Sequence, residues 1–396
     1  MIYDLIVIGG GAAGFFAAIH AKNTKPHANV LLLEKTAVLL SKVRISGGGR
    51  CNVTHSCFTP PNLVKNYPRG SKELLAPFQI FQPSDTIEWF ESKGIRLKTE
   101  SDGRMFPITD QSETIIECLV SEANRLGIEI ELRQRVEIIS KHDSIFSLHL
   151  KEGKILQTHR LILATGNSPE GHAFAEGLGH SIQKPVPSLF TFNSPSSPLK
   201  SLSGVSVQNV ELRIADFIQT GPLLITHFGF SGPAALKLSA WGARYLHEKN
   251  YHVELIVNWL PQLSQEMIFQ KLSHLKTQLP HRHLHSENVF ELPKNLWKAL
   301  LEHLAEMRMN DISLQDLRLF SKKLHADSYQ IEGKTTNKEE FVTCGGINLK
   351  EVNFKTMQSK LCPGLFFAGE ILDIDGVTGG FNFQNAWTTG FIAGSN

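Results

Sequence analysis

The first residues that could carry chemistry are the glycines of GGGAAG, residues 9–14, which contain the spacing G-x-G-x-x-G. Apolar residues 3–8 predict a buried strand before this segment, and residues 15–22 predict a helix after it. Glycines in this place allow a tight turn, and the start of the helix attracts a pyrophosphate. Glu34 ends a second predicted strand, residues 30–33, and could bind ribose hydroxyls. This combination predicts a dinucleotide site.

A second unusual segment is SGGGRCNVTH, residues 46–55. Three consecutive glycines suit neither a helix nor a strand and lose much entropy on folding, so we expect a close approach to the backbone here. Over residues 34–72, one acid, Glu34, accompanies a run of seven cations. The cations are Lys35, Lys42, Arg44, Arg50, Lys65, Arg69 and Lys72. The run predicts a nearby anionic ligand, with a solvated loop as the alternative.

Two later segments indicate which dinucleotide is bound. RLILAT, residues 160–165, precedes Gly166, and GLFFAGE spans residues 364–370. Each predicts a buried strand that meets a glycine, and the second adds an acid just past the strand. Two-dinucleotide-binding flavoproteins carry both features, and their last acid typically contacts the ribityl chain of FAD. FAD is therefore predicted, and the first and last thirds of the chain should build one domain.

Composition sets the broad class. The 396 residues suffice for two or three domains, and 41% hydrophobic with 20% charged residues is typical of a globular protein. No apolar run is long enough for a membrane span, and the N-terminus does not resemble a signal peptide. The five scattered cysteines predict reduced thiols in a cytoplasm and no structural zinc. A net charge of +2 predicts no strong general attraction to nucleic acid.

Five long segments give the chain a family resemblance. They are SGGGRCNVT (46–54), GRMFPITD (103–110), THFGFSGPAAL (226–236), VTCGGINLKEV (342–352) and PGLFFAGEILDIDGVTGGFNFQNAW (363–387). Over nearly its whole length the chain resembles the bacterial FAD-dependent oxidoreductases of the BaiN/RdsA type, also called YhiN-like. It departs from the family pattern at His55, where Asn is usual, and in residues 167–174, which replace a longer Gly/Ser-rich loop.

The resemblance implies an α/β fold with an insertion. A Rossmann-like FAD-binding domain of the two-dinucleotide-binding flavoprotein type would comprise residues 1–187 and 341–396. The inserted domain, residues 188–340, would combine a β-barrel (188–260 and 327–340) with a helical part (261–326). The local patterns agree with this division. Strands are predicted over residues 207–218, 223–228, 251–259 and 327–332, and helices over residues 266–275 and 296–307.

The resemblance also implies which residues contact FAD. They are Gly9, Gly11, Ala12, Ala13, Gly14, Glu34, Lys35, Ser46, Gly47, Gly48, Gly49, Arg50, Cys51, Asn52, Val136, Ala164, Thr165, Gly166, Gly369, Glu370, Asp375, Gly379, Gly380, Phe381 and Asn382. Residues 378–384 should start the last helix, whose first amides would stabilise negative charge on the reduced ring. Asn382 and Gln384 are candidate side-chain contacts there. No metal is expected, because His281, His283 and His285 fit a solvated loop.

Cys51 and His227 are the candidate catalytic residues. The resemblance implies that Cys51 lies close to the flavin ring, where it could donate a proton to a substrate carbon; inert packing is the alternative. A redox disulfide with Cys57 lacks the supporting C-x-x-C spacing. His227, in the inserted domain, is either a substrate ligand or a structural histidine. Asp373 and Asp375 could act as an acid–base pair, but a turn that helps bind FAD fits their spacing better.

These features predict an enzyme that transfers hydride from reduced FAD to an unsaturated acceptor. Because no second G-x-G-x-x-G is found, NAD(P)H is expected as a transient reductant. The resemblance implies a uridine of 23S ribosomal RNA as the acceptor, with Lys65, Arg69 and Lys72 as candidate contacts to RNA phosphates. The alternatives are a conjugated carbonyl or steroid-like compound, an amine, and a flavoprotein binding or assembly module without turnover. The oligomeric state is left open.

Overall fold

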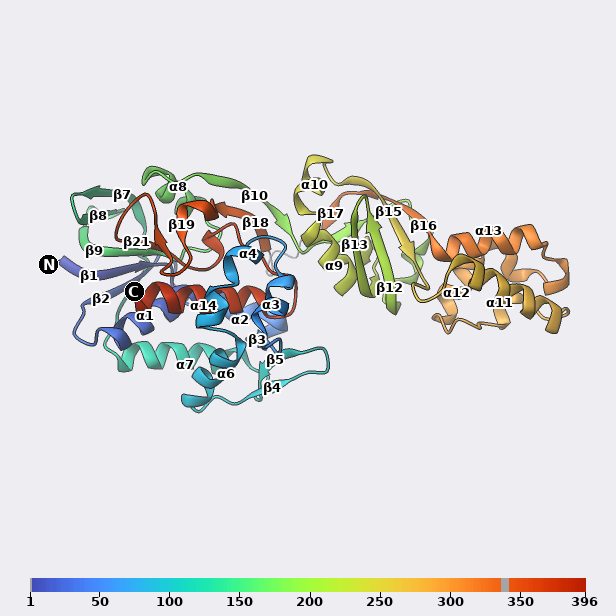
Figure 1. Cartoon of the computed structure of the whole chain (residues 1–396), viewed down its shortest axis with the longest axis horizontal. Helices are drawn as coiled ribbons and strands as arrows, with labels where there is room; N and C mark the ends of the chain where they lie inside the picture. Colours follow the sequence, from blue (N-terminus) through green and yellow to red (C-terminus); the bar gives the residue numbers. More distant parts are fainter. Residues whose placement is uncertain (1, 336–341) are drawn as a thin grey trace. The chain divides into compact units, whose positions relative to one another are not determined.

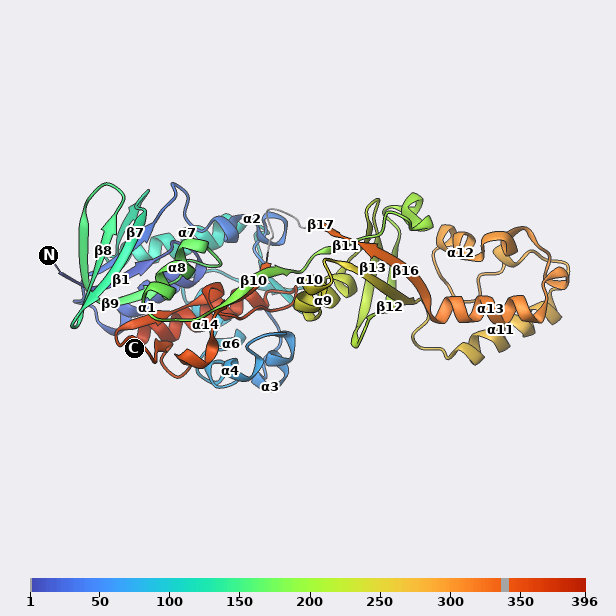
Figure 2. The same cartoon turned by 90° about the horizontal axis from the view of Figure 1, so that it is seen from above.

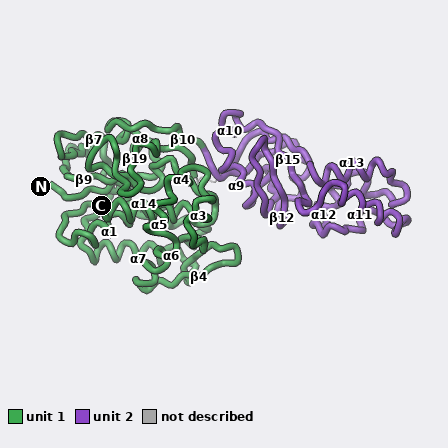
Figure 3. Tube along the Cα trace, viewed as in Figure 1, with its two compact units in different colours: residues 1–186, 338–396 green, residues 187–337 purple. Residues whose placement is uncertain are grey.

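The computed structural model describes residues 2–335 and 342–396. The chain divides into two compact units, residues 1–186 with 338–396 (unit 1) and residues 187–337 (unit 2), as coloured in Figure 3. The expected return of the FAD domain at residue 341 lies outside the described residues. Among the helices of the described ranges, none has the length and apolar character needed to cross a membrane.

Unit 1 is built on a nine-stranded sheet with a parallel centre (Figure 1). β1 (Ile2–Ile8) lies between β2 (Val30–Glu34) and β9 (Ile155–Leu163) and is parallel to both. β21 (Leu365–Phe367) pairs in parallel with β9, so the C-terminal segment joins the same sheet. β6 (Glu129–Leu132) extends the sheet beyond β2. The apolar runs in β1 and β2 suit a parallel sheet covered on both faces. The predicted Rossmann-like α/β fold is confirmed.

Two helices of unit 1 pack side by side although they stand at opposite ends of the chain (Figures 1 and 2). They are α1 (Ala12–Thr24) and α14 (Phe381–Ser395). A Cβ added at Gly390 would lie 2.7 Å from the carbonyl oxygen of Ala13, and one added at Gly394 would lie 2.2 Å from that of Ala17. The two helices therefore run in the same direction and touch through backbone.

The other elements of unit 1 lie around this core. The helices are α2 (Ser41–Gly49), α3 (Pro60–Leu63), α4 (Ser71–Leu74), α5 (Pro77–Ile80), α6 (Pro83–Ser92), α7 (Ser112–Arg125) and α8 (Pro169–Gly177). The strands are β3 (Thr54–His55), β4 (Leu97–Thr99), β5 (Arg104–Pro107), β7 (Val136–His142), β8 (Ile145–Leu150), β18 (Val342–Ile347), β19 (Val352–Asn353) and β20 (Gln358–Ser359), with β10 (Ile182–Ser188) leading towards unit 2. The expected loop over 167–174 is mostly helix α8, because Ser168 caps it and Pro169 suits its first turn.

Unit 2 contains a seven-stranded sheet in the order β16-β15-β12-β13-β14-β11-β17. Its strands are β11 (Thr191–Asn193), β12 (Ser206–Ile214), β13 (Phe217–Ile225), β14 (Gly229–Ser231), β15 (His252–Asn258), β16 (Asp327–Glu332) and β17 (Lys334–Thr335). The two ends of this order, β16 and β17, are joined through Gly333. Next to β11, the Ser194 hydroxyl donates to the Gln330 carbonyl in β16 at 2.7 Å. The sheet therefore curls until its ends meet.

Helices complete the core of unit 2. They are α9 (Pro233–Trp241), α10 (Ala243–Glu248), α11 (Gln265–Gln278), α12 (Lys294–Leu301) and α13 (Leu314–His325). Two sequence expectations need correction. The strand predicted over 207–218 is broken by a turn at Ala215, whose φ is 48°. The helix predicted over 296–307 ends at Leu301, because Glu302 has a φ of 51° and starts a short 3-10 turn.

Candidate functional site

The turn between β1 and α1 has the geometry of a phosphate-binding turn. Gly9 has a φ of 115°, and a Cβ there would lie 2.4 Å from the Ala164 carbonyl oxygen. A Cβ at Gly14 would lie 1.9 Å from the Gly9 carbonyl oxygen, whereas one at Gly11 would meet nothing within 4 Å. Gly11 starts α1 without a side-chain cap, and the first turn holds no acid. The first amides of α1, including Ala12 and Ala13, are therefore available to an anion.

Glu34 lies directly beside this turn. Its Oε2 atom accepts the Gly10 amide at 2.9 Å, and its Oε1 atom accepts the Thr36 amide at 2.8 Å. A cleft opens next to it at the carboxyl ends of β1 and β2. Its lining residues are Ile8, Gly9, Leu33, Glu34, Lys35, Gln134, Arg135, Val136, Thr165, Ser168, Glu170 and Phe174. Five of the predicted FAD contacts, from four separate segments, thus share one cleft.

The cleft includes two charged residues that sequence reasoning missed. Glu170 pairs with Lys35 at 2.9 Å and with Arg135 at 3.4 Å. Glu170 belongs to α8 and Arg135 directly precedes β7, neither of which follows a recognisable motif. These segments are far from β2 in the sequence, and they lie near it only because of how the strands of the sheet are paired. The one available signal was the neighbouring Val136, which the resemblance had indicated.

The first turn of α14 forms a second uncapped helix start. Its N-cap is Gly380, with a φ of 93°, no side-chain cap and no acid in the first turn. Gly390 lies beside Ala13, but Gly390 is nine residues into α14 whereas Ala13 is one residue into α1. At 1.5 Å per residue, α14 therefore begins about 12 Å beyond the start of α1. The starts of α1 and α14, each of which attracts an anion, are therefore offset by about 12 Å along the helices.

Glu370 follows Gly369, which lies between α1 and α14. Gly369 packs between the two helices, since a Cβ there would lie 2.9 Å from Ala13 Cβ and 4.0 Å from Ala386 Cβ. The Glu370 carboxylate lies 3.8 Å from a Cβ added at Gly166 and forms an ion pair with Lys42. The structure therefore gathers Gly166, Gly369 and Glu370 from distant segments, as predicted FAD contacts should be. Lys42, one of the seven cations of residues 34–72, is the partner of Glu370 here.

The triple-glycine segment lies within the bounds of α2 but breaks the helix into a tight loop. Ser46 leaves the helix with a ψ of 147°, and Gly47, Gly48 and Gly49 all have positive φ. The Ser46 carbonyl accepts the amides of Arg50 and Cys51. A Cβ at Gly48 or Gly49 would meet nothing within 4 Å, so this side of the loop leaves room for a ligand.

Asn52 joins the loop to the start of α14. With its amide oxygen towards Gly380, Asn52 accepts the Gly380 amide at 2.9 Å and donates to the Thr54 carbonyl at 3.0 Å. The Tyr67 hydroxyl donates to the Phe381 carbonyl at 2.7 Å, and the Phe381 ring lies under Gly379. The residues predicted around the loop and around α14 therefore meet in one place.

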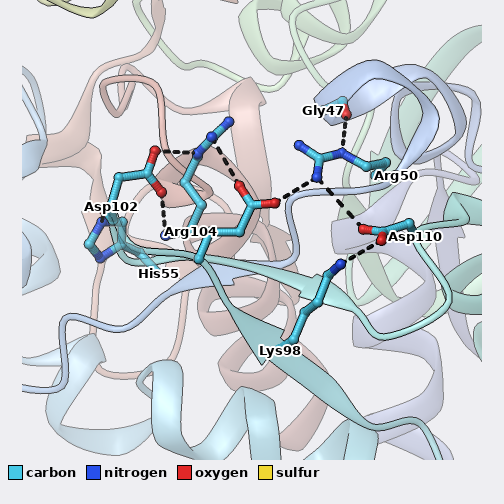
Figure 4. Close-up of polar contacts among 8 residues, drawn as sticks. Gly47, Arg50, His55, Lys98, Asp102, Arg104 and Asp110 are labelled. Atoms are coloured by element: carbon cyan, nitrogen blue, oxygen red, sulfur yellow. Dashed lines mark hydrogen bonds and ion pairs between the residues drawn. The ribbon is translucent and has the colours of Figure 1, made fainter. Parts of the chain in front are cut away.

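Arg50 is engaged away from the expected diphosphate position. Its guanidinium forms an ion pair with Glu100 at 2.6 Å and lies 3.6 Å from Asp110 (Figure 4). It also stacks 4.0 Å from the centre of the Phe106 ring. These partners belong to the β4–β5 hairpin and the turn after it. A direct contact with the cofactor therefore stays a prediction without support from this arrangement.

Cys51 is enclosed within the protein. The residue is 0% exposed, and burial raises the pKa of its thiol to about 12. A thiol in this environment stays protonated but has no surface from which to reach a substrate carbon, which favours the packing alternative over the proton donor. Cys51 and Cys57 are both free thiols, so they form no disulfide.

Three predicted polar contacts near α14 are used within the protein. Asp375 is fully buried and forms a two-pronged ion pair with Arg69. The Asn382 amide group bonds both the amide and the carbonyl of Gly376, at 2.8 and 2.9 Å. The Gln384 side chain is buried and accepts two threonine hydroxyls. These side chains shape the segment before α14, so backbone amides remain the candidate contacts. Asp375 has no place in an acid–base pair with a substrate.

The cation run over residues 34–72 is largely neutralised by acids from elsewhere in unit 1. Lys35 pairs with Glu170, Lys42 with Glu370, Arg44 with Glu113, Arg50 with Glu100 and Arg69 with Asp375. Among the ion pairs of the described residues, none involves Lys65 or Lys72. A contact of Arg69 with RNA phosphate stays a prediction without support from this arrangement, because its charge pairs with a buried carboxylate.

His227 belongs to unit 2 and lies at a hairpin tip between β13 and β14. The hairpin is closed by the Thr226 amide, which donates to the Gly229 carbonyl at 2.8 Å. His227 and Phe228 are exposed, with ring centroids 4.0 Å apart. Its role towards a substrate stays a prediction. In unit 2, His283 and His285 bond backbone carbonyls, and the described residues contain no cluster suited to a metal ion.

The chain is similar to known proteins over nearly its whole length. The family model described as HI0933-like protein Rossmann domain matches residues 3–396. A ribosomal RNA dihydrouridine synthase of Escherichia coli K12 is 30% identical over 98% of this chain and 96% of its own. A 3-dehydro-bile acid delta(4,6)-reductase of Clostridium scindens is 27% identical over 98% and 97%. A Rhodococcus jostii 3-ketosteroid-delta4-(5alpha)-dehydrogenase structure has a TM-score of 0.53 at 14% identity, covering 100% of this chain and 97% of that one, and supports the fold alone. The chain belongs to the HI0933-like family.

Proposed function

We propose that this protein uses FAD to reduce a carbon–carbon double bond, and that its acceptor is a uridine of ribosomal RNA. Family membership and full-length relatives identify the broader class of the chain, which is that of the FAD-dependent oxidoreductases. The observation that carries the cofactor assignment is the pair of uncapped helix starts. They lie about 12 Å apart in depth, with the Glu34 cleft beside one and the glycine loop beside the other.

This arrangement suits an extended dinucleotide. The amides at the start of α1 would hold the diphosphate, because they have no cap and Gly11 leaves room in front of them. Glu34 is held by two backbone amides, so its remaining lone pairs are oriented to accept ribose hydroxyls. When bound, FAD supplies the hydride chemistry. The start of α14 would stabilise negative charge near the ring. NAD(P)H as the reductant is part of the proposal.

Two relatives support the RNA acceptor. The Escherichia coli protein and a Haemophilus influenzae protein, both named ribosomal RNA dihydrouridine synthase, are 30% and 29% identical to this chain over 98% of it. A uridine in a duplex cannot present its 5,6 double bond to the site, so the target must be unpaired or flipped out. A conjugated small molecule is the second candidate, supported by the bile acid reductase relative at 27% identity and similar coverage.

One experiment separates the two acceptors. Ribosomal RNA from cells with and without the gene is digested and mapped by mass, and the purified protein is assayed with NADPH on unmodified ribosomal RNA and on a 3-oxo-4-ene steroid. We expect yellow protein that releases FAD in acid, and a dihydrouridine that disappears on deletion. Release of FMN or of no flavin would refute the cofactor assignment. Unchanged dihydrouridine together with steroid reduction would transfer the proposal to the small-molecule acceptor.

A further inference from the structure

We propose that Arg50 is a positioning residue that holds the triple-glycine loop, residues 46–52, in the shape that receives the cofactor. It acts through Glu100 on the β4–β5 hairpin and not through contact with the FAD diphosphate. This inference rests on the proposed FAD-dependent function.

The loop needs support from outside itself. Four of its residues, Gly47, Gly48, Gly49 and Cys51, have positive φ. Glycine loses more backbone freedom on folding than any other residue, and three in sequence offer no side chains to pack. Within the loop, one acceptor, the Ser46 carbonyl, gathers the amides of Arg50 and Cys51. The position of the glycines must therefore be fixed by neighbouring segments.

Arg50 supplies this support through two nitrogen atoms of its guanidinium. Its Nε donates to the Gly47 carbonyl at 3.4 Å, and its Nη1 lies 2.6 Å from Glu100 Oε1. Phe106 completes the support: the guanidinium lies 4.0 Å from its ring centre, and a Cβ at Gly47 would lie 2.9 Å from its Cε1 atom. One planar cation thus ties the first glycine of the loop to the hairpin, a geometry that lysine cannot reproduce.

The charges around Arg50 are balanced by the hairpin itself (Figure 4). Arg104 bonds Glu100 at 3.0 Å and Asp102 at 2.7 Å, and Lys98 bonds Asp110. Three cations and three carboxylates therefore form one network. The Glu100 hydrogen bond raises the pKa of Arg50, as expected for a cation committed to an acid. Because these carboxylates neutralise most of its charge, Arg50 attracts a diphosphate only weakly.

The opposite side of the loop is open. A Cβ at Gly48 or Gly49 would meet no atom within 4 Å, so nothing in the described residues fills that side. At the end of the loop, Asn52, with its amide oxygen towards Gly380, accepts the amide of this N-cap residue of α14 at 2.9 Å. Fixing Gly47 through Arg50 therefore also fixes how the loop meets α14.

The test compares Arg50→Ala, Glu100→Gln and the double variant with the wild type. The FAD dissociation constant of the apoprotein is measured by flavin fluorescence, and the melting temperature of the apoprotein is measured alongside. Arg44→Ala is the matched control, because Arg44 forms a similar ion pair with Glu113 but does not touch the loop. We expect Arg50→Ala and Glu100→Gln each to weaken FAD binding about tenfold, a loss typical of orienting groups. The double variant should be no worse than Arg50→Ala, because the two residues act as a unit.

Stability and a conservative variant provide independent readouts. The Arg50 and Glu100 side chains are 32% and 27% exposed, so each single change should alter the melting temperature little. Arg50→Lys should restore FAD binding only partly, and the visible circular dichroism of its bound flavin should differ from wild type. Unchanged or tighter FAD binding in Glu100→Gln, or full rescue by Arg50→Lys, would overturn the positioning role. A wild-type apoprotein that takes up no FAD would instead overturn the proposed function and, with it, this inference.

Discussion

We expect unit 1 to lose stability in mild acid because of His20. This residue lies on α1, the helix that begins at the dinucleotide turn, and is 8% exposed. Its ring centroid lies 4.6 Å from those of both Phe16 and Phe391. Among the described residues, its Nε2 atom has no hydrogen-bond partner. Burial, and to a smaller extent the charge of Lys93, lowers the pKa of His20 from 6.5 to about 4.

The direction of the effect depends on which state of the chain binds the proton. Above pH 6.5, His20 is neutral in both the folded and the unfolded chain and adds no pH dependence. Between pH 6.5 and about 4, the unfolded chain binds a proton that the folded chain refuses, so the free energy of unfolding falls as the pH falls. The pKa difference corresponds to a loss of ~3 kcal/mol in total, of which ~2 kcal/mol is already lost at pH 5.

The substitution His20→Phe removes the titrating group and keeps an aromatic ring in the cluster. The protein is equilibrated in urea at pH 7.5 or pH 5.0. A short hydrogen-exchange pulse at one fixed pH then measures how strongly α1 peptides are protected. This readout reports the unfolding of unit 1 alone. Wild type should lose ~2 kcal/mol more than the variant between the two pH values. His142→Gln, at an exposed position in the same unit, should behave as wild type. Equal losses in wild type and His20→Phe would refute the reasoning.

Four further predictions concern the site. Glu34→Arg should weaken FAD retention on gel filtration by ~10-fold or more, because a carboxylate that accepts hydrogen bonds is replaced by a cation. Cys51→Ser should lower stability by ~1–3 kcal/mol and leave the acceptor rate within about twofold, whereas a loss of 10²-fold or more would restore the proton-donor role. Arg69→Glu should destabilise unit 1 by ~3–5 kcal/mol or more in urea unfolding, because it replaces the cation beside a buried carboxylate with a second negative charge. Lys65→Glu with Lys72→Glu should reduce activity on RNA but not NADPH oxidation with an artificial electron acceptor.

The local parts of the site could be predicted from the sequence, and the long-range parts could not. The turn over residues 9–14 depends on glycine spacing between a strand and a helix, which is visible within a short window. Glu170 and Arg135 enter the cleft only through the arrangement of distant strands. The partners of the cation run could not be predicted for the same reason: the acids that neutralise Lys42 and Arg69 stand 328 and 306 residues away in the sequence. The sequence shows where charged residues stand along the chain but not which residues they form ion pairs with.

Cys51 illustrates a second limit. The same SGGGRCN segment predicted closeness to the cofactor for all of its residues, but neighbouring residues in a loop point in different directions. Gly48 and Gly49 face open space, whereas Cys51 is fully enclosed and Arg50 turns towards the hairpin. The motif therefore identified the loop, but only the contacts and burial of each residue show which side of the loop it occupies.

The internal ion pairs also limit how the cation run could hold RNA. If all seven cations of residues 34–72 contacted phosphates, the logarithm of affinity would fall with the logarithm of salt concentration with a slope of about −5 to −6. Five of them pair with carboxylates, whereas none of the ion pairs of the described residues involves Lys65 or Lys72. Two phosphate contacts correspond to a slope of about −1.4 to −1.8, or ~25- to 60-fold weaker binding for a tenfold rise in salt. If the Lys65 and Lys72 variant abolishes most of that slope, the segment binds RNA through these two side chains. A wild-type slope near −5 would show that the paired cations are released on binding and would contradict this account.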